Sequence, residues 1–567
     1  MHGDPDSIVA PAARPAPFHA YLSELRSLRI GCHSEVVFAF AASSCWLLLY
    51  NPNFWRQTIA AMWQPSFGTI LFLASLLLLL IAIHATVLLL APTQRAMRTL
   101  ASLMFMVAAI GSYFVGAYGV ALDEDMLRNV AETDLAEVAG LINPGFLLHV
   151  AFLGVVPGIL VWRVVLPTSR WQARFVQRAV FLGAALAVCL SGVFASYASY
   201  ASYFREYKSI RYALVPLIPI ASAIALAQDV WEDAHGRALV DRSGIVERTT
   251  ATGSRPLVLF IVVGETARAA DFQLAGYERP TNPELSKVEN LVYFDRATSC
   301  GTATAISVPC MFSHRGRRTF DSDQARNETN ALDSLARAGF AVEWRDNNGG
   351  CKAVCARIPT IVYAPSPDNR ALCPHAYCYD EIMLTDLADT LRLIDRDTAI
   401  VFHLIGSHGP AYAERYPPSF ERFKPACQTS QLQRCTREEI VNAYDNTIAY
   451  TDYVIARQIE LLQAARDRVD TALIYVSDHG ESLGEQGMYL HGMPYAVAPL
   501  VQKEIPMLVW TSRGYAQRTG LSVTCLRSSA NRPVSHDNVY DTLLGAGEVR
   551  DALYDPKADL LNACRSK

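Results

Sequence analysis

Residues 472–481 read Ala-Leu-Ile-Tyr-Val-Ser-Asp-His-Gly-Glu, and this stretch decides the fold. Its apolar first half is typical of a buried β-strand, which ends abruptly at Asp478 and His479. In open α/β sheets, ligands bind beyond the carboxyl ends of the strands. A carboxylate and an imidazole at such an end are suitable ligands for a metal ion. The stretch therefore predicts an α/β sheet with a metal site at one edge.

Two other apolar runs end in the same way. Residues 256–265 read Pro-Leu-Val-Leu-Phe-Ile-Val-Val-Gly-Glu and end at Glu265, while residues 399–403 end at His403 and lead into His408. Parallel strands present their carboxyl ends at a common edge, so we expect the side chains from these three ends to form one metal site. The alternative for a strand-end histidine is a buried hydrogen bond within the core.

Strand-like and helical patterns alternate through the C-terminal half of the chain. The strand-like runs cover residues 257–263, 291–295, 340–344, 398–404, 472–477 and 505–510. The clearest helix covers residues 438–463, where apolar side chains recur at helical spacing. This alternation predicts an α/β fold with a mostly parallel sheet and helices on both faces.

The N-terminal part is much more apolar than the rest. Hydrophobic residues make up 51% of the 567-residue chain. Long apolar stretches, each able to cross most or all of the ~30 Å hydrocarbon core of a bilayer, lie at residues 35–51, 67–91, 97–121, 144–166 and 175–197. We interpret the first as a retained helix rather than a cleaved signal peptide, because a long segment precedes it. The sequence thus predicts an α-helical membrane domain with five transmembrane helices.

These patterns divide the chain into three parts. We expect a transmembrane domain at residues 1–200, a bridging helix and linker at 201–255, and a catalytic domain at 256–567. Arginines such as Arg95 and Arg98 concentrate in one set of loops, which marks that side of the membrane as cytoplasmic. Five spans then place the catalytic domain outside the cytoplasm. A net charge of -4 gives no indication of a nucleic-acid partner.

The cysteine spacing gives a second, independent indication that the catalytic domain lies outside the cytoplasm. Three of the thirteen cysteines fall in or near the apolar stretches, and the others follow residue 299. Short loops favour pairing of close neighbours, and persistent disulfides indicate an oxidising compartment such as the periplasm. The expected close pairs are Cys300 with Cys310, Cys351 with Cys355, Cys373 with Cys378, and Cys427 with Cys435, and Cys525 and Cys564 remain as a possible fifth pair. A zinc–cysteine cluster is the alternative, but these spacings lack the paired CxxC form.

Tyrosines recur every three or four residues directly after the fifth apolar stretch. They are Tyr197, Tyr200, Tyr203 and Tyr207. On a helix they form one aromatic stripe, and such side chains are common at membrane–water interfaces. We expect either a bridging helix on the outer membrane surface or an ordinary buried stripe.

A segment rich in small and hydroxyl side chains lies between Cys300 and Cys310. It contains three candidate nucleophiles, Thr302, Thr304 and Ser307. A metal ion makes a hydroxyl a useful nucleophile at neutral pH by stabilising its alkoxide. Chemistry alone does not choose among the three, and a plain polar turn is the alternative.

Four motifs resemble those of a known enzyme family. They are Val263-Gly264-Glu265-Thr266-Ala267-Arg268, the segment from Cys300 to Ser313, Asn442-Ala443-Tyr444-Asp445-Asn446, and the segment from Ser477 to Pro494. In this order they are similar to motifs of the phosphoethanolamine transferases that modify lipid A, which include the mobile colistin-resistance enzymes. The resemblance covers nearly the whole chain and implies five spans followed by an alkaline-phosphatase-like domain.

The resemblance implies roles for individual residues. Thr304 matches the family's nucleophile, and Glu265, Asp478 and His479 match the ligands that hold zinc beside it. A further set matches positions that bind the phosphoryl group, the substrate or another zinc ion, and two of its members, Glu481 and His491, are candidates for acid–base catalysis. The set is Asn348, Lys352, His408, Glu481 and His491.

A polar stripe precedes the fourth apolar stretch. Asn129, Thr133 and Glu137 are spaced four residues apart and would share one face of a helix. From the residues alone, a solvated helix face is the simpler interpretation. The family uses a matching stripe near the lipid headgroup, so the resemblance implies that these side chains bind substrate.

The implied reaction is transfer of phosphoethanolamine from phosphatidylethanolamine to a lipid A phosphate, through a covalent phosphoethanolamine-threonine intermediate. The implied setting is the bacterial inner membrane, with the catalytic domain in the periplasm, and we expect a monomer. The alternatives are transfer to a core sugar or periplasmic glucan, hydrolysis by a membrane-tethered phosphodiesterase or sulfatase-like enzyme, and a non-catalytic lipid-binding protein. A sulfatase would need Cys or Ser in place of Thr304, and a non-catalytic protein would not need metal ligands at several strand ends.

Overall fold

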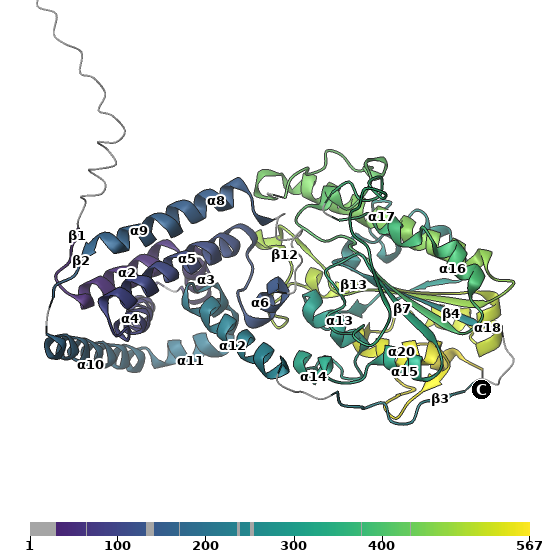
Figure 1. Ribbon diagram of the computed structural model, residues 1–567, viewed down its shortest axis with the longest axis horizontal. Coiled ribbons are helices and arrows are strands. Elements are labelled where there is room, and N and C mark those ends of the chain that lie inside the picture. The colour runs from purple at the N-terminus through teal and green to yellow at the C-terminus, as the bar shows by residue number, and fades with distance from the viewer. Residues whose placement is uncertain are drawn as a thin grey trace, which may run out of the picture. The chain divides into compact units, whose positions relative to one another are not determined.

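The structure is a computed structural model that describes residues 30–566, apart from residues 64, 132–140, 169, 235–238, 250–254, 376 and 431. The chain forms two compact units (Figure 1). The first contains residues 59–109 and 149–206 together with those before residue 51. The second contains residues 51–58, 110–148 and 207–567. Parts of the expected membrane domain thus belong to the same unit as the expected catalytic domain.

Four helices in the described part of the chain are long and apolar enough to cross a membrane. They are α4 (Phe67–Leu89), α5 (Gln94–Tyr118), the continuous run of α8 (Pro144–Val150), a π-helical turn (Ala151–Val155) and α9 (Val156–Arg163), and α10 (Trp171–Ala195). The first expected span is the shorter helix α2 (Glu35–Leu49), which is followed by α3 (Pro52–Met62). The 15 residues of α2 give it a length of ~22 Å, so among the described residues length and composition identify four possible spans, and α2 is one of two shorter apolar helices.

A buried ion pair joins three helices of the first unit. Glu35, at the start of α2, is buried, and its Oε2 accepts from Nη2 of Arg178 on α10 at 2.7 Å. Nη1 of Arg178 donates to the carbonyls of Leu89 and Ala91, at and just beyond the end of α4. Removing Arg178 would leave the buried Glu35 with its longer contact to Arg174 at 3.6 Å, so the pair of Glu35 with Arg178 stabilises the packing of these helices.

The tyrosine stripe lies on α11 (Tyr197–Glu206). Tyr200 and Tyr203 are buried against Phe72 of α4, whereas Tyr197 is exposed. Two of the tyrosines therefore pack as a buried stripe within the first unit. The same unit contains one short parallel strand pair, β1 (Ile30–Gly31) with β2 (Val164–Val165), among its described residues.

A seven-stranded sheet forms the centre of the second unit in the described part of the chain. Its strands, in spatial order, are β5 (Leu291–Tyr293), β14 (Met507–Thr511), β10 (Asp470–Ser477), β4 (Leu257–Gly264), β9 (Thr398–His403), β7 (Ala341–Asp346) and β8 (Thr360–Val362). From β10 to β8 all neighbouring strands are parallel, whereas β14 is antiparallel to both of its neighbours. The sheet is therefore mixed, and its parallel part contains the strands whose ends carry Glu265, His403 and Asp478.

Helices cover both faces of the sheet. In Figure 1, α16 (Leu387–Leu393) and α17 (Arg437–Ala464) lie on one side, and α15 (Ala331–Arg337) and α20 (Val539–Ala546) lie on the other. Every residue of β4 and β10 is buried. Strands that are buried on both faces have continuous apolar sequences, which is why these two runs are so clear in the sequence.

Shorter elements complete the second unit. The helices are α6 (Glu124–Ala131), α12 (Leu217–Ala234), α13 (Thr304–Phe312), α14 (Ser322–Arg326), α18 (Arg513–Thr519) and α19 (Val523–Ser528). The paired short strands are β3 (Glu247–Arg248) with β16 (Val549–Arg550), β6 (Ala297–Thr298) with β13 (Glu504–Ile505) and β15 (Val534–Ser535), and β11 (Ser482–Leu483) with β12 (Tyr489–Leu490). Helix α12 lies within residues 201–255, where the sequence predicts a bridging helix and a linker.

Five disulfides cross-link the second unit. They join Cys300 to Cys310, Cys351 to Cys355, Cys373 to Cys378, Cys427 to Cys435, and Cys525 to Cys564. The first four are the close pairs that the spacing predicts, and the fifth joins the two cysteines that the sequence indicates as a possible pair. Cys300 and Cys310 enclose Thr304 and most of α13, so this disulfide restrains the chain where it enters that helix.

Candidate active site

The pairing of the central strands brings two carboxylates together. Gly264, the last residue of β4, is opposite Ser477, the last residue of β10. The next residues, Glu265 and Asp478, therefore leave the sheet side by side, and both are buried. His479 follows directly. Groups from distant parts of the chain thus meet at the carboxyl edge of the sheet.

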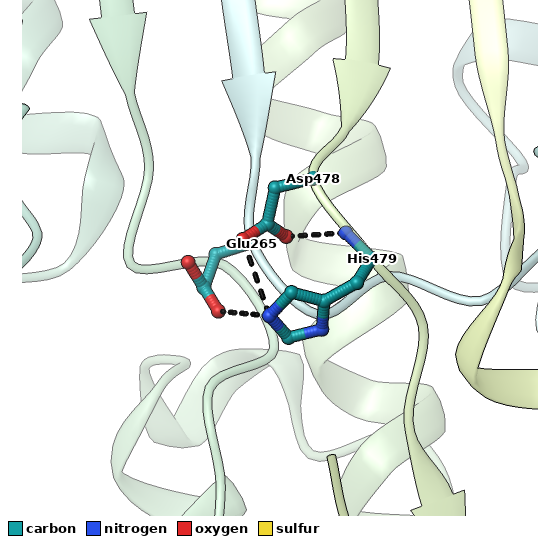
Figure 2. A group of neighbouring side chains, drawn as sticks. All are labelled: Glu265, Asp478 and His479. Carbon is teal, nitrogen blue, oxygen red and sulfur yellow. Dashed lines mark hydrogen bonds and ion pairs between the residues drawn. The ribbon is translucent and has the colours of Figure 1, made fainter. Parts of the chain in front are cut away.

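Glu265, Asp478 and His479 form a compact group that could hold a metal ion (Figure 2). Nε2 of His479 lies 3.2 Å from Oδ2 of Asp478 and 3.5 Å from Oε1 of Glu265. Nδ1 of His479 lies 2.9 Å from the carbonyl oxygen of Gly480. A proton on Nδ1 is donated to that carbonyl, which leaves Nε2 as the ligand atom.

The hydroxyl of Thr304 completes this group. Thr304 is the first residue of α13, and its Oγ1 lies 3.3 and 3.2 Å from Oε1 and Oε2 of Glu265. The same oxygen lies 3.3 Å from Nε2 of His479. A single hydroxyl therefore faces both the carboxylate and the imidazole.

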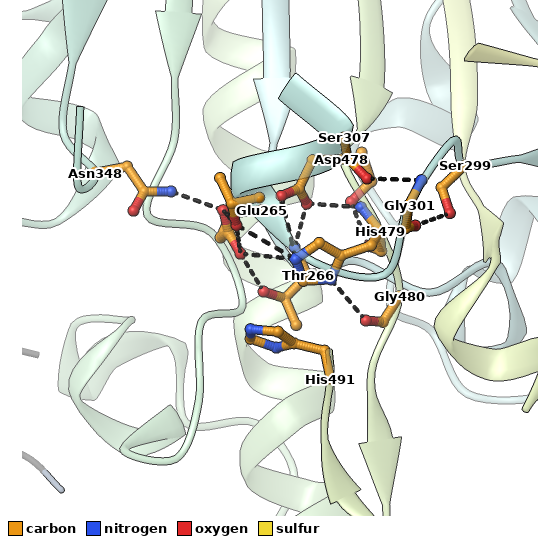
Figure 3. A network of polar contacts seen from close by, with 12 residues as sticks. Glu265, Thr266, Ser299, Gly301, Ser307, Asn348, Asp478, His479, Gly480 and His491 are labelled. Carbon is orange, nitrogen blue, oxygen red and sulfur yellow. Dashed lines mark hydrogen bonds and ion pairs between the residues drawn. The ribbon is translucent and has the colours of Figure 1, made fainter. Parts of the chain in front are cut away.

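The two other candidate hydroxyls make hydrogen bonds elsewhere. Thr302 donates to the carbonyl of Met493 at 2.5 Å. Ser307 accepts from the N–H of Gly301 at 3.1 Å (Figure 3). A Cβ on Gly301 would lie 2.8 Å from Ile306, so glycine lets the segment fold tightly back onto α13. The structure thus distinguishes three hydroxyls that are equivalent by chemistry alone.

The two buried carboxylates are strongly coupled. Burial opposes ionisation of Glu265, but the imidazoles of His479, His408 and His491 hold its pKa below the usual range. Burial and the adjacent charge of Glu265 raise the pKa of Asp478 to about 7. Oδ2 of Asp478 accepts no hydrogen bond. A buried carboxylate oxygen without a donor, next to a second carboxylate and an imidazole nitrogen, fits a cation between them.

A turn in an unusual backbone conformation orients both carboxylates. Thr266 has a φ of 59°, which is uncommon for a β-branched residue. Its N–H donates to Oδ1 of Asp478 at 3.0 Å, and its hydroxyl donates to Oε1 of Glu265 at 2.6 Å (Figure 3). On the other strand end, a Cβ on Gly480 would lie 2.0 Å from the carbonyl oxygen of Val501. Only glycine permits this close approach of two backbones.

Asn348 contacts Glu265 from another side (Figure 3). Its Nδ2 donates to Oε2 of Glu265 at 2.8 Å and to the carbonyl of Leu404 at 3.0 Å. It also lies 3.4 Å from Nε2 of His403, whose Nδ1 is 3.1 Å from Oδ2 of Asp346. His403 therefore supports Asn348 from the core and is separate from the group of possible metal ligands.

A second group of ionisable side chains borders the first. The ring centres of His479 and His491 are 4.3 Å apart, and those of His491 and His408 are 5.5 Å apart. Nδ1 of His491 lies 3.5 Å from Oε2 of Glu481. Burial raises the pKa of Glu481 to about 8. His408, Glu481 and His491, from different segments, thus lie together beside the metal group.

The structure also places other residues that the sequence singles out. The ammonium of Lys352 donates to the carbonyl of Gly349 at 2.9 Å, in the loop after β7. Asn129 is buried on α6. Thr133 and Glu137 lie outside the described residues, so the polar stripe that they form with Asn129 stays a prediction.

Helix α6 contacts α14 and the loop around Gly492 in its own unit. Arg128 forms an ion pair with Asp323 of α14 at 3.1 Å. Sδ of Met126 lies 3.1 Å from the position that a Cβ on Gly492 would occupy, next to His491. Helix α6 is thus held against the loop that carries His491.

His536 links the segment before Thr304 to the end of β10, although the sequence does not predict it as a site residue. Its Nδ1 accepts from the N–H of Cys300 at 3.0 Å, and its Nε2 donates to the carbonyl of Ser477 at 2.9 Å. Burial lowers its pKa to about 4, so the neutral ring serves as acceptor and donor at once. It lies 59 residues beyond Ser477, and no local pattern reveals this contact.

The motif at residues 442–446 on α17 holds three loops. Asn442 donates to the carbonyl of Pro425 at 2.8 Å, and Tyr444 donates to the carbonyl of Thr266 at 2.7 Å. Asp445 accepts from the hydroxyl of Tyr277 at 3.0 Å, and Asn446 accepts from the N–H of Phe423 at 2.8 Å. The motif therefore positions the site from outside it.

Known proteins match this chain over most of its length. A family model for phosphoethanolamine transferase EptA/EptB matches residues 46–230, and a sulfatase model matches residues 257–549. The chain is 38% identical to phosphoethanolamine transferase EptA of Escherichia coli (strain K12), over 93% of this chain and 96% of that protein. It is 37% identical to phosphatidylethanolamine transferase Mcr-1 of Escherichia coli, over 79% of this chain and 83% of that protein.

A solved structure has the same architecture. It is the integral membrane protein lipooligosaccharide phosphoethanolamine transferase A (EptA) from Neisseria meningitidis, with a TM-score of 0.88 and 34% identity. The match covers 95% of this chain and 100% of that one. These similarities show that the chain belongs to the lipid A phosphoethanolamine transferase family of the alkaline phosphatase superfamily.

Proposed function

We propose that this protein transfers phosphoethanolamine from phosphatidylethanolamine to a lipid A phosphate, through a covalent intermediate on Thr304 and with zinc as cofactor. The observation that carries the proposal is the position of Thr304, whose Oγ1 lies 3.2 Å from Glu265 and 3.3 Å from His479. Membership of the family supports the reaction class.

The ligand group fits a four-coordinate zinc ion. Bonds of about 2.0–2.2 Å at tetrahedral angles put neighbouring ligand atoms about 3.3–3.6 Å apart. Four separations among Oε1 of Glu265, Oδ2 of Asp478, Nε2 of His479 and Oγ1 of Thr304 lie between 3.2 and 3.5 Å. Bound zinc supplies positive charge that stabilises an alkoxide and offsets negative charge on phosphoryl oxygens.

In the first half-reaction Thr304 is the nucleophile. Its Oγ1 attacks the phosphorus of phosphatidylethanolamine, an Oγ1–P bond forms, and the P–O bond to glycerol breaks. The acceptor for the hydroxyl proton is Oε2 of Glu265, at 3.2 Å. Because Thr304 begins the nine-residue helix α13, the first N–H groups and the positive end of the helix dipole favour the phosphoryl oxygens.

Other side chains bind the substrate and supply a proton. We assign protonation of the leaving diacylglycerol oxygen to His491, which Glu481 orients and which lies next to His479. Phosphoryl and headgroup contacts are assigned to Asn348, Lys352, His408, Asn129, Thr133 and Glu137. Amide, ammonium and imidazole donors suit the phosphate oxygens of a phospholipid.

In the second half-reaction the acceptor phosphate attacks the intermediate. One of its oxygens attacks the phosphorus on Thr304, a P–O–P bond forms, and the Oγ1–P bond breaks. Thr304 regains its proton from Glu265, which received it in the first half-reaction, and the proton of the attacking phosphate monoester returns to His491. Covalent catalysis thus replaces one difficult displacement by two easier ones.

The membrane helices give this reaction its setting. Both substrates are lipids, so attachment to the same membrane raises their effective concentration near the site. We place the protein as a monomer in the bacterial inner membrane, with five spans and the catalytic domain in the periplasm, where disulfides persist. The added amine reduces the negative charge of lipid A, which weakens binding of cationic peptides such as polymyxin.

The match to the sulfatase model makes a hydrolase the second candidate. A sulfatase requires Cys or Ser at the nucleophile, where this chain has Thr304. A phosphodiesterase would pass the group to water, and a related transferase would pass it to a core sugar or a periplasmic glucan. The phosphodiesterase and the related transferases share the first half-reaction, so analysis of the acceptor separates them.

Mass spectrometry tests the proposal directly. The full-length protein and its Thr304→Ala variant are expressed, and both the lipid A and the peptide containing residue 304 are analysed. We expect phosphoethanolamine on lipid A and, in donor-rich and acceptor-poor conditions, on Thr304. Thr302→Ala is the matched control and should retain both. An unmodified Thr304 peptide would argue against the covalent step, whereas a modified peptide with unchanged lipid A would identify a different acceptor.

A further inference from the structure

Two cations lie over one aromatic ring beside the nucleophile segment. The guanidinium carbon of Arg317 is 4.3 Å from the centre of the Tyr495 ring, and the ammonium nitrogen of Lys503 is 5.2 Å from it. Arg317 is exposed, and Tyr495 and Lys503 are partly exposed. The cluster is therefore accessible to a ligand from solvent.

Neither cation forms an ion pair within the described residues. Two acidic side chains are adjacent, but Asp537 accepts from the backbone N–H of Arg317 at 2.8 Å and Glu504 is an exposed neighbour of Lys503. Partial burial and the positive charge of Arg317 lower the pKa of Lys503. The two positive charges thus repel each other, and a bound anion would relieve that repulsion.

The cluster is joined to the nucleophile segment at two points. The carbonyl of Lys503 accepts from the N–H of Ser299 at 2.8 Å. The carbonyl of Met493, close in sequence to Tyr495, accepts from the hydroxyl of Thr302 at 2.5 Å. Ser299 and Thr302 both belong to the segment that leads directly into Thr304.

We propose that Arg317, Lys503 and Tyr495 form the binding site for the phosphate of the acceptor lipid. This assignment rests on the transfer reaction proposed above, in which the donor phosphorus is bonded to Thr304 and a second phosphate must approach it. A phosphate monoester carries up to two negative charges, whereas the donor headgroup is zwitterionic, so two cations without counterions favour the acceptor. The Tyr495 ring attracts both cations and fixes their spacing.

The first experiment separates the two half-reactions. The Arg317→Gln/Lys503→Gln variant, in detergent, is given phosphatidylethanolamine alone and then lipid A, and the Thr304 adduct is followed by mass spectrometry. We expect normal formation of the adduct, and decay at subsaturating lipid A slower by about tenfold for each cation removed. Arg318→Gln is the matched control, because this neighbouring arginine is not over the ring, and it should behave like the parent. Slower adduct formation would assign the site to the donor and overturn the proposal, as would unchanged decay.

The second experiment does not depend on the covalent step. The Thr304→Ala protein, with and without the Arg317→Gln/Lys503→Gln changes, is titrated with lipid A and with dephosphorylated lipid A in mixed micelles. We expect the two changes to weaken binding of lipid A at least tenfold and to leave binding of the dephosphorylated lipid unchanged. Equal weakening of both, or none, would overturn the proposal even if the Thr304 adduct forms. Failure of the parent to form the adduct would refute the proposed reaction but leave this binding result interpretable.

Discussion

The hydroxyl of Tyr444 donates to the backbone carbonyl of Thr266 at 2.7 Å. The hydroxyl oxygen of Tyr444 also accepts a hydrogen bond from the N–H of Arg268 at 3.0 Å. One side chain of α17 therefore fixes both sides of the turn that follows β4. Thr266 in turn donates to Glu265 and Asp478. The position of both carboxylates therefore depends on a tyrosine that contacts neither of them.

Replacing Tyr444 by Phe removes this hydroxyl and keeps the ring. We expect zinc affinity and transfer activity to fall about tenfold, as when outer partners of a metal site are lost. The free energy of unfolding should fall by only about 0.5–1.5 kcal/mol. Isothermal titration calorimetry with chelator-treated protein measures the affinity. Tyr293→Phe is the control, because the buried Tyr293 hydroxyl makes no hydrogen bond, and equal zinc affinity in the two variants would contradict this role of Tyr444.

Removal of the metal should destabilise the parent more than the Asp478→Asn variant. In the metal-free protein, Oδ2 of Asp478 is buried without a donor next to Glu265. An amide at this position removes one of the two adjacent charges, so chelator-treated Asp478→Asn should be more stable than the chelator-treated parent by about 1–3 kcal/mol.

Thermal unfolding with and without zinc measures the loss of stability on metal removal and the difference in stability between the parent and Asp478→Asn. Zinc should stabilise the parent by about 2.7 kcal/mol at 100 times its Kd and should not stabilise Asp478→Asn. Asp271→Asn is the control, because the carboxylate of Asp271 is paired with Arg268, and this variant should be less stable with or without zinc. A zinc-induced shift of equal size in Asp478→Asn would exclude Asp478 as a ligand.

Asp452 on α17 should make stability depend on pH. It accepts from the N–H groups of Glu284 and Leu285, and burial nevertheless raises its pKa to about 7. Because the unfolded value is about 3.9, the folded state binds the proton more tightly. The contribution of Asp452 to stability is therefore complete below about pH 4 and is lost as the pH rises through about 7.

Denaturant titrations of the parent and Asp452→Asn between pH 4 and 8 test this linkage. We expect the variant to lose stability less steeply with rising pH than the parent, and to be less stable at pH 4 by about 1 kcal/mol because the amide accepts only one of the two N–H groups. Asp541, whose pKa burial also raises to about 7, contributes to both curves. The difference between the curves therefore isolates Asp452, and parallel curves would contradict the raised pKa.

The ion pair between Glu35 and Arg178 should be essential in the first unit. Arg178→Gln leaves Glu35 with Arg174 at 3.6 Å as its remaining cation. We expect the variant to lose about 3–5 kcal/mol of stability, measured as thermal unfolding in detergent. Adding Glu35→Gln should restore part of the loss because no buried charge is then left unpaired. A double variant as unstable as the single one would indicate that the hydrogen bonds of Arg178 to Leu89 and Ala91 dominate.

The strands and the polar side chains at their ends could be predicted from the sequence because one physical pattern encodes both. The run at 472–477 is apolar because helices cover both faces of the sheet, and it ends where the chain reaches the site. The direction of the run at 505–510 could not be predicted. Apolar spacing is the same in either orientation, and this run forms the antiparallel strand β14.

Other features depend on contacts that no short segment encodes. Thr302, Thr304 and Ser307 have similar chemistry, and only the start of α13 and the fold of the segment before it decide which hydroxyl faces Glu265. His536 takes its role from a contact with Ser477 on a distant strand.

Helix α17 is one continuous helix of 28 residues, and one short motif on it holds three loops, among them the turn at Thr266. Because the three loops are hydrogen-bonded to the same helix, their positions relative to one another are fixed by that helix. An insertion within α17 would rotate the attachment points of all three loops together. Transplanting a single loop from a relative should therefore succeed only when the matching side chains of α17 are transplanted with it.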